Sequence, residues 1–181
     1  MQTGLELTRH VGLLALAVLC VYTDLARGKL YNWITYGGLA LGLSTAYILD
    51  AYNPGYHHIT AAALAAAVGG GILFLIYLTG GLGAGDVKFM AAVGALSPYI
   101  RDRIGSLGFM MVALMYAALV GAGIALAVLI WKRRLLQGLR DSLRTLFTFR
   151  APKSDSAISL TIPYGVAIGI GVMWAWAEVV L

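Results

Sequence analysis

Six apolar segments run through the 181 residues of the chain, the fourth of them short. They cover residues 5–21, 33–49, 59–78, 87–97, 104–131 and 158–181. Only 12% of the residues are charged, against about 25% in soluble domains, so a charged shell around a water-soluble core cannot be built. A membrane-spanning helix needs about 20 mainly apolar residues. We therefore expect an all-α polytopic membrane bundle of about six transmembrane helices, and we exclude a soluble enzyme, a disordered chain and a disulfide scaffold.

The positive charges predict how the bundle is oriented. With the N-terminus outside, the inside loops hold ten of the 13 Lys and Arg residues, and only Arg9, Arg101 and Arg103 remain outside. Cytoplasmic loops carry an excess of Lys and Arg. We expect a multi-pass protein of the inner (cytoplasmic) membrane with both termini outside. The net charge of +5 is then a topology signal, and no nucleic-acid partner is expected.

The segment 132–150 has a pattern of its own. Its apolar residues recur at steps of three and four, with arginines largely between them; they are Leu135, Leu136, Leu139, Leu143, Leu146 and Phe147. This pattern predicts an amphipathic helix on the inner membrane surface, facing anionic lipid. The alternative is a stalk that continues the fifth span. Residues 151–157 then form a linker, and the whole chain, 1–181, is one membrane-embedded domain.

Cysteine and histidine give little sign of special chemistry. Cys20 ends an apolar run, but Leu19 before it is not the small residue of a lipoprotein signal, and no cleavage site follows. We therefore expect an uncleaved first span. Neighbouring His57 and His58 lack further residues to complete a metal site, so no metal is expected.

Two aspartates stand out among the acidic residues. Asp50 and Glu178 fall at the outer interface, where we expect no catalytic task for them. Asp24 ends the first span and Asp86 begins the fourth, which puts both at the inner side. Four glycines in residues 80–85 precede Asp86. The residues alone leave two possibilities open: a helix cap and an exposed carboxylate, or a catalytic pair.

Three short motifs resemble those of the type IV prepilin peptidases, in the same order along nearly the whole chain. Residues 83–88, Gly-Ala-Gly-Asp-Val-Lys, resemble the GxGD signature. Asp24 with Leu25, Arg27 and Asn32 resembles the first motif, although Tyr31 stands where the family usually has proline. Residues 162–165, Ile-Pro-Tyr-Gly, match a third pattern.

The resemblance implies an aspartic endopeptidase without cofactor or metal. It implies that Asp24 and Asp86 share one proton and activate a water molecule. The substrate would be a prepilin-like precursor with a basic leader before a membrane helix. The expected substrate-binding residues are Gly83, Gly85, Lys88, Pro163 and Tyr164. For three of them a structural role remains open: Lys88 as an interface lysine, Pro163 as a helix-start proline and Tyr164 as an interface aromatic residue.

The form of the enzyme follows from the same resemblance. One cysteine and no insertion imply the short, peptidase-only form found with tight-adherence pili, without N-methyltransferase activity. An archaeal preflagellin peptidase shares this core and remains an alternative, as does a non-catalytic transporter or assembly subunit. A presenilin-type protease is disfavoured, because Thr23 precedes Asp24 in place of tyrosine and the Pro-Ala-Leu motif is absent.

Overall fold

The computed structural model describes residues 2–52, 57–97, 105–131 and 164–180, and these residues form α-helices without any strand. The helices are α1 (Gln2–Arg27), α2 (Asn32–Tyr52), α3 (His58–Leu78), α4 (Ala84–Leu96), α5 (Ser106–Trp131) and α7 (Tyr164–Val180). The predicted all-α helical bundle is therefore confirmed. The predicted interfacial segment 132–150 and the linker 151–157 lie outside the described residues.

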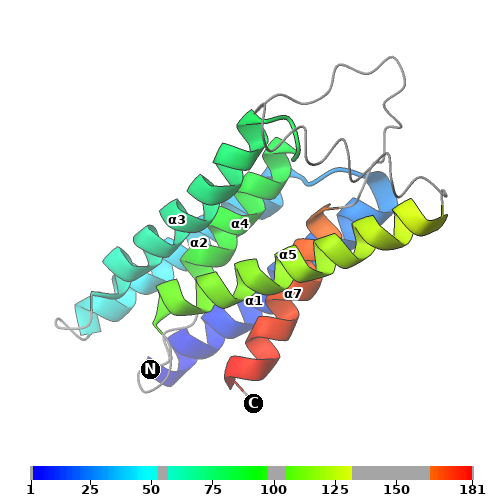
Figure 1. Cartoon of the computed structure of the whole chain (residues 1–181). Coiled ribbons are helices and arrows are strands. Elements are labelled where there is room, and N and C mark those ends of the chain that lie inside the picture. The colour runs from blue at the N-terminus through cyan, green and yellow to red at the C-terminus, as the bar shows by residue number, and fades with distance from the viewer. Residues whose placement is uncertain (1, 53–56, 98–104, 132–163, 181) are drawn as a thin grey trace.

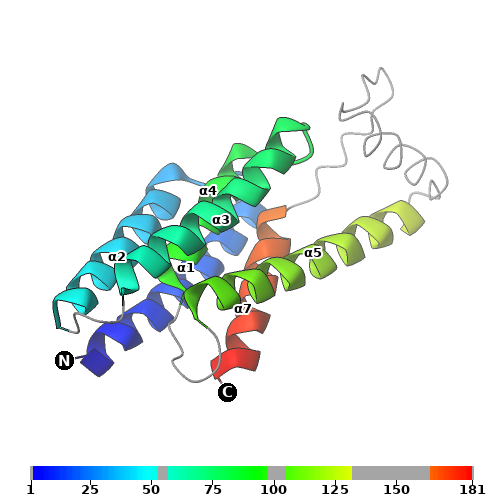
Figure 2. The same ribbon diagram turned by 60° about the vertical axis from the view of Figure 1, so that its left-hand side comes forward.

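The helices form an antiparallel bundle (Figure 1). The start of α1 and the end of α7 lie at the same end of it, in both views (Figures 1 and 2). The end of α1 and the starts of α4 and α7 therefore meet at the opposite end, and α1, α4 and α7 contact one another. Asp24 and Asp86 thus lie at one end of the bundle, as the sequence predicts.

Helix α4 is the centre of the bundle, because it contacts each of the other described helices. Phe89, Met90 and Val93 are fully buried. Glycine permits the closest approach: a Cβ on Gly94 would stand 2.5 Å from the backbone of Ala65 on α3. With 13 residues, α4 is about 20 Å long, shorter than the roughly 30 Å of a bilayer core. It is therefore a core helix that does not span the bilayer by itself.

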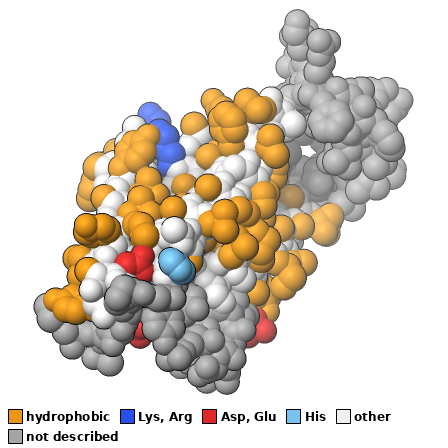
Figure 3. Space-filling model, turned by 90° about the vertical axis from the view of Figure 1, so that its left-hand side faces the viewer, with side chains coloured by type: hydrophobic (Ala, Val, Ile, Leu, Met, Phe, Trp, Pro, Cys, Tyr) orange, Lys and Arg blue, Asp and Glu red, His pale blue; other side chains and the backbone are white. Residues whose placement is uncertain are grey.

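The outer helices have the character of membrane spans. Among the described residues, three helical stretches are long and apolar enough to cross a membrane: Gly4–Arg27, His58–Leu78 and Ser106–Val128. Large apolar side chains cover their outer faces, with Leu75 65% and Leu119 61% exposed. One side of the molecule is largely hydrophobic, with its charged side chains toward the two ends (Figure 3). Large exposed apolar surfaces mark membrane or protein contacts, and together with the three helices of spanning length they indicate a membrane protein.

Two connections fix how the helices begin and end. Gly28, at a φ of +61°, ends α1, and its N–H donates to the Asp24 carbonyl at 2.8 Å. This is a left-handed cap of the kind that favours glycine. At the other end, the Asp50 carboxylate accepts hydrogen bonds from the N–H groups of His58 (2.5 Å) and Ile59 (2.9 Å). Asp50 therefore caps α3, a structural role that its place in the sequence does not reveal.

Candidate active site

Asp24 lies on the last turn of α1, against the first turn of α7. Its Oδ2 accepts a hydrogen bond from the Val166 N–H at 3.1 Å, and the Gly165 N–H also approaches the carboxylate. A Cβ on Gly165 would stand only 2.8 Å from Asp24 Oδ2 and 3.0 Å from its Cγ. Glycine at 165 therefore lets the carboxylate reach the backbone donors at the start of α7.

Asp86 lies on the first turn of α4 and is 8% exposed. Its Oδ2 accepts a hydrogen bond from the Gly83 N–H at 3.1 Å, which closes the turn in the manner of a capping box. Asp86 thus does stabilise a helix start, as one of the two possibilities from the sequence requires. No described residue donates to its second oxygen, Oδ1. Capping therefore leaves that oxygen available for other chemistry.

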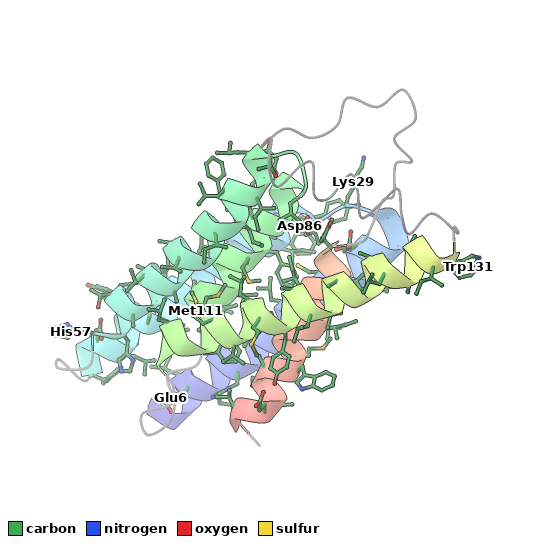
Figure 4. The ribbon with its side chains drawn as sticks, in the orientation of Figure 1. Glu6, Lys29, His57, Asp86, Met111 and Trp131 are labelled. Carbon is green, nitrogen blue, oxygen red and sulfur yellow. The ribbon has the colours of Figure 1, made fainter. Side chains whose placement is uncertain are left out.

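The structure places the two aspartates at the same end of the bundle. The carboxylate of Asp24 is close enough to that of Asp86 for their charges to interact, and the buried Cys20 lies within the field of both. Both carboxylates also face a helix N-terminus, where backbone N–H groups and the helix dipole stabilise negative charge. Figure 4 shows Asp86 at the same end of the bundle as Lys29 and far from Glu6.

Lys88 turns away from Asp86 and toward the start of α2. Its Nζ donates to Asn32 Oδ1 at 2.9 Å and lies 5.2 Å from the centre of the Tyr36 ring. The residue joins two of the sequence motifs, since Asn32 belongs to the first and Lys88 to the second. Lys88 remains a predicted substrate contact, because nothing in the structure tests that role.

The two predicted glycines of the loop face neighbouring parts of the chain. A Cβ on Gly85 would lie 3.0 Å from the Cβ of Leu30, and one on Gly83 would lie 3.2 Å from Asp86 Oδ2. Gly85 therefore gives room to the loop between α1 and α2, and Gly83 gives room to the Asp86 carboxylate. Their contact with substrate also stays a prediction.

The remaining predicted residues lie at the start of α7. Tyr164 is half-buried and interacts electrostatically with Asp86. It therefore lies at the same end of the bundle as the aspartates. Pro163 lies outside the described residues. Within the described part of the chain, no group of three or more His, Cys, Asp or Glu residues could hold a metal ion.

Sequence reasoning missed three contacts around the aspartates. It treated Gly165 only as part of a motif, although this residue seats Asp24. It gave no role to Leu30, which packs on Gly85, and it did not pair Asn32 with Lys88. Motifs of one family contain both residues of the last pair, but the motifs do not indicate that the two side chains bond to each other. The other two contacts join segments far apart in the chain and have no local signature.

Comparison with family models identifies the family of the chain. Residues 11–126 match the type IV leader peptidase family. The matched range contains both aspartates and runs from α1 into α5. Searches of curated proteins and of solved structures found no match. Because the family model covers well over half of the sequence, this membrane-embedded chain belongs to the type IV leader peptidases and is a peptidase.

Proposed function

We propose that the chain is an aspartic endopeptidase that removes the basic leader of type IV prepilin-like precursors. The carrying observation is that Asp24 and Asp86 lie at one end of the bundle, close enough for their charges to interact, in a chain of the leader peptidase family. Both side chains are held by backbone donors from helix N-termini. At Asp86 this support leaves the second oxygen, Oδ1, without a donor among the described residues.

The chemistry follows from two carboxylates that share one proton. The ionised carboxylate takes a proton from a water molecule, whose oxygen attacks the scissile carbonyl carbon. The protonated carboxylate donates its proton to the carbonyl oxygen, giving a neutral tetrahedral intermediate. When the C–N bond breaks, the proton gained from water passes to the amine, and the hydroxyl proton of the intermediate returns to the other aspartate. The pair is thereby restored.

The substrate follows from where the pair lies. A prepilin-like precursor has a short basic leader that stays in the cytoplasm and a membrane helix after it, so its scissile bond lies at the inner membrane surface. We place the aspartates at that surface because the excess of Lys and Arg predicts a cytoplasmic face at this end. Gly83, Gly85, Lys88, Pro163 and Tyr164 are the proposed substrate contacts. The inner membrane and its anionic lipids would be the other partners.

We further propose the short, peptidase-only form, acting on tight-adherence-type precursors. The chain has a single cysteine, whereas the methyltransferase domain of the larger enzymes binds zinc through paired cysteines. The free amine of the cleaved pilin would therefore leave unmethylated. A preflagellin-type substrate is the alternative that the same experiment can distinguish.

Leader cleavage in membranes tests the proposal. The wild type, Asp24→Asn and Asp86→Asn would each be co-expressed with candidate prepilins and preflagellins, and leader loss and N-methylation read by mass spectrometry. We expect cleavage to fall at least about 100-fold in either variant, the usual contribution of a general acid or base. Tyr47→Phe, which removes one exposed hydroxyl on α2, is the control and should cleave normally.

Two results would contradict the proposal. Normal processing by either Asp→Asn variant, at equal protein level, would exclude the catalytic pair. Failure of the wild type to cleave every precursor offered would favour a non-catalytic assembly subunit. A methylated product would contradict only the peptidase-only form.

A further inference from the structure

Arg9 is the most deeply buried charged side chain among the described residues, at 2% exposure. It lies at the end of the bundle opposite the aspartates, near Glu6 and Asp50. Its Nη2 donates to two carbonyl oxygens at the C-terminal end of α4, those of Ala95 at 3.2 Å and Ser97 at 2.6 Å. Its Nε and Nη1 have no hydrogen-bond partner among the described residues.

These contacts lie where α4 ends. The last carbonyl groups of a helix have no partner within it, and in a buried helix they need one from outside. A positive charge at this position is also favoured by the helix dipole. Arg9 therefore caps α4 from another helix, across 86 and 88 residues of sequence.

The contact between Arg9 and the end of α4 matters because α1 also carries Asp24 and α4 also carries Asp86. Asp24 lies on α1 about four turns beyond Arg9, and the fully buried Leu13 and Cys20 lie on the same face between them. Asp86 lies at the start of α4, whose end Arg9 holds. One helix pair therefore carries the two aspartates at one end and the arginine cap at the other.

We infer that Arg9 is a positioning residue: by holding the end of α4 against α1, it sets the axial register of these helices and thereby the separation of Asp24 and Asp86. Movement of α4 toward α2 is already blocked, since a Cβ on Gly42 would stand 2.5 Å from the Ala95 backbone. Movement along the helix axis is what hydrogen bonds to the terminal carbonyls oppose. This inference rests on the proposed function, because it gives the register a catalytic consequence.

The first test compares Arg9→Met and Arg9→Lys with the wild type in leader cleavage, on protein purified as a monodisperse species. A displacement of about 1 Å can cost roughly 100-fold in rate. We expect kcat of Arg9→Met to fall at least about tenfold while KM stays nearly constant, and Arg9→Lys, which keeps one charged donor, to recover part of the loss. Thr8→Val is the matched control, since Thr8 is exposed and bonds only within α1, to the Gly4 carbonyl.

A second test does not depend on catalysis. In a Cys20→Ser background, the thiols of Asp24→Cys and Asp86→Cys would be joined by a short bifunctional reagent, with and without Arg9→Met. We expect slower cross-linking when Arg9 is absent. Unchanged cross-linking overturns the inference, as does a folded Arg9→Met enzyme with wild-type kcat. If Arg9→Met does not fold, Arg9→Lys serves in both tests.

The proposed function and the proposed role of Arg9 can be refuted independently of each other. A wild type without leader cleavage would remove the proposed function, and the cross-linking rates would still report on Arg9. A wild type that needs both aspartates, together with an Arg9 variant that matches it in kcat and cross-linking, would remove only the role of Arg9.

Discussion

Asp24 and Asp86 differ in how the chain holds them, although both face the start of a helix. Asp86 bonds to Gly83, three residues before it, so its position is set locally. Asp24 bonds to Val166, 142 residues away, so its position depends on how α7 packs against α1. The side chain of Asp24 is therefore the more sensitive of the two to changes in distant parts of the molecule.

Gly165→Ala should reduce activity through Asp24. The new methyl group would overlap the carboxylate, with only 2.8 Å to Oδ2 and 3.0 Å to Cγ, and would push it from its backbone donors. We expect kcat/KM for leader cleavage to fall at least about tenfold, equivalent to roughly 1.4 kcal/mol in transition-state stabilisation. Gly123→Ala is the control, since no atom lies within 4 Å of its Cβ position. Equal rates for the two variants would show that Gly165 does not seat the carboxylate.

Helix α4 dominates at the scale of elements. It is too short to span a bilayer and is enclosed by the longer helices. Its close contacts are made between backbones at Gly94 and Gly42. Apolar area gives no drive for association between helices in lipid, so close packing at small residues contributes most. The register of α4 therefore depends on these glycines as well as on its caps.

Gly94→Ala should destabilise the bundle. The added Cβ would stand 2.5 Å from both the carbonyl carbon and the carbonyl oxygen of Ala65, and backbone atoms cannot move away as a side-chain end can. Overpacking of this kind costs about 1–3 kcal/mol, which thermal unfolding in detergent can measure. Gly71→Ala on α3, where nothing lies within 4 Å, should keep or raise the melting temperature. A Gly94→Ala protein as stable as wild type would mean that α3 and α4 separate easily.

The whole molecule has hydrophobic sides and two chemically different ends. Asp24 and Asp86 lie at one end, while Glu6 and Asp50 lie at the other with the buried Arg9 between α1 and the end of α4. An apolar flank of this kind places the bundle in lipid, and the two ends then face opposite sides of the membrane. Both the chemistry of the pair and the orientation of the bundle can be tested on the intact protein.

The pH dependence of cleavage should be bell-shaped. Activity requires one ionised and one protonated carboxylate. Activity should fall at low pH, where both carboxylates are protonated, and fall again at high pH, where both are ionised. The two apparent pKa values of this profile belong to the pair and not to either residue. Initial rates of leader cleavage across a pH series, in nanodiscs, would provide the profile. A rate that rises steadily to alkaline pH would instead indicate a different kind of nucleophile.

Orientation should be visible by cysteine labelling in whole cells. In a Cys20→Ser background, Lys29→Cys in the loop after α1 and Ala51→Cys at the end of α2 place exposed residues at opposite ends of the bundle. With the predicted topology, a membrane-impermeant maleimide labels position 51 in intact cells and reaches position 29 only after permeabilisation. The reverse pattern would put the aspartates on the outer side and exclude cytoplasmic leader cleavage.

The sequence by itself determined the class of fold, the approximate bounds of most helices and the end of the bundle at which Asp24 and Asp86 lie. Each of these depends on residues close together in the chain. Runs of apolar residues specify helices in lipid, and Asp86 lies in a local glycine motif. Only the tertiary structure decided that Asp24 rests on the start of α7, that Lys88 turns to Asn32 and that Arg9 caps α4. These contacts join segments that close packing brings together, and no local pattern encodes which partners will meet.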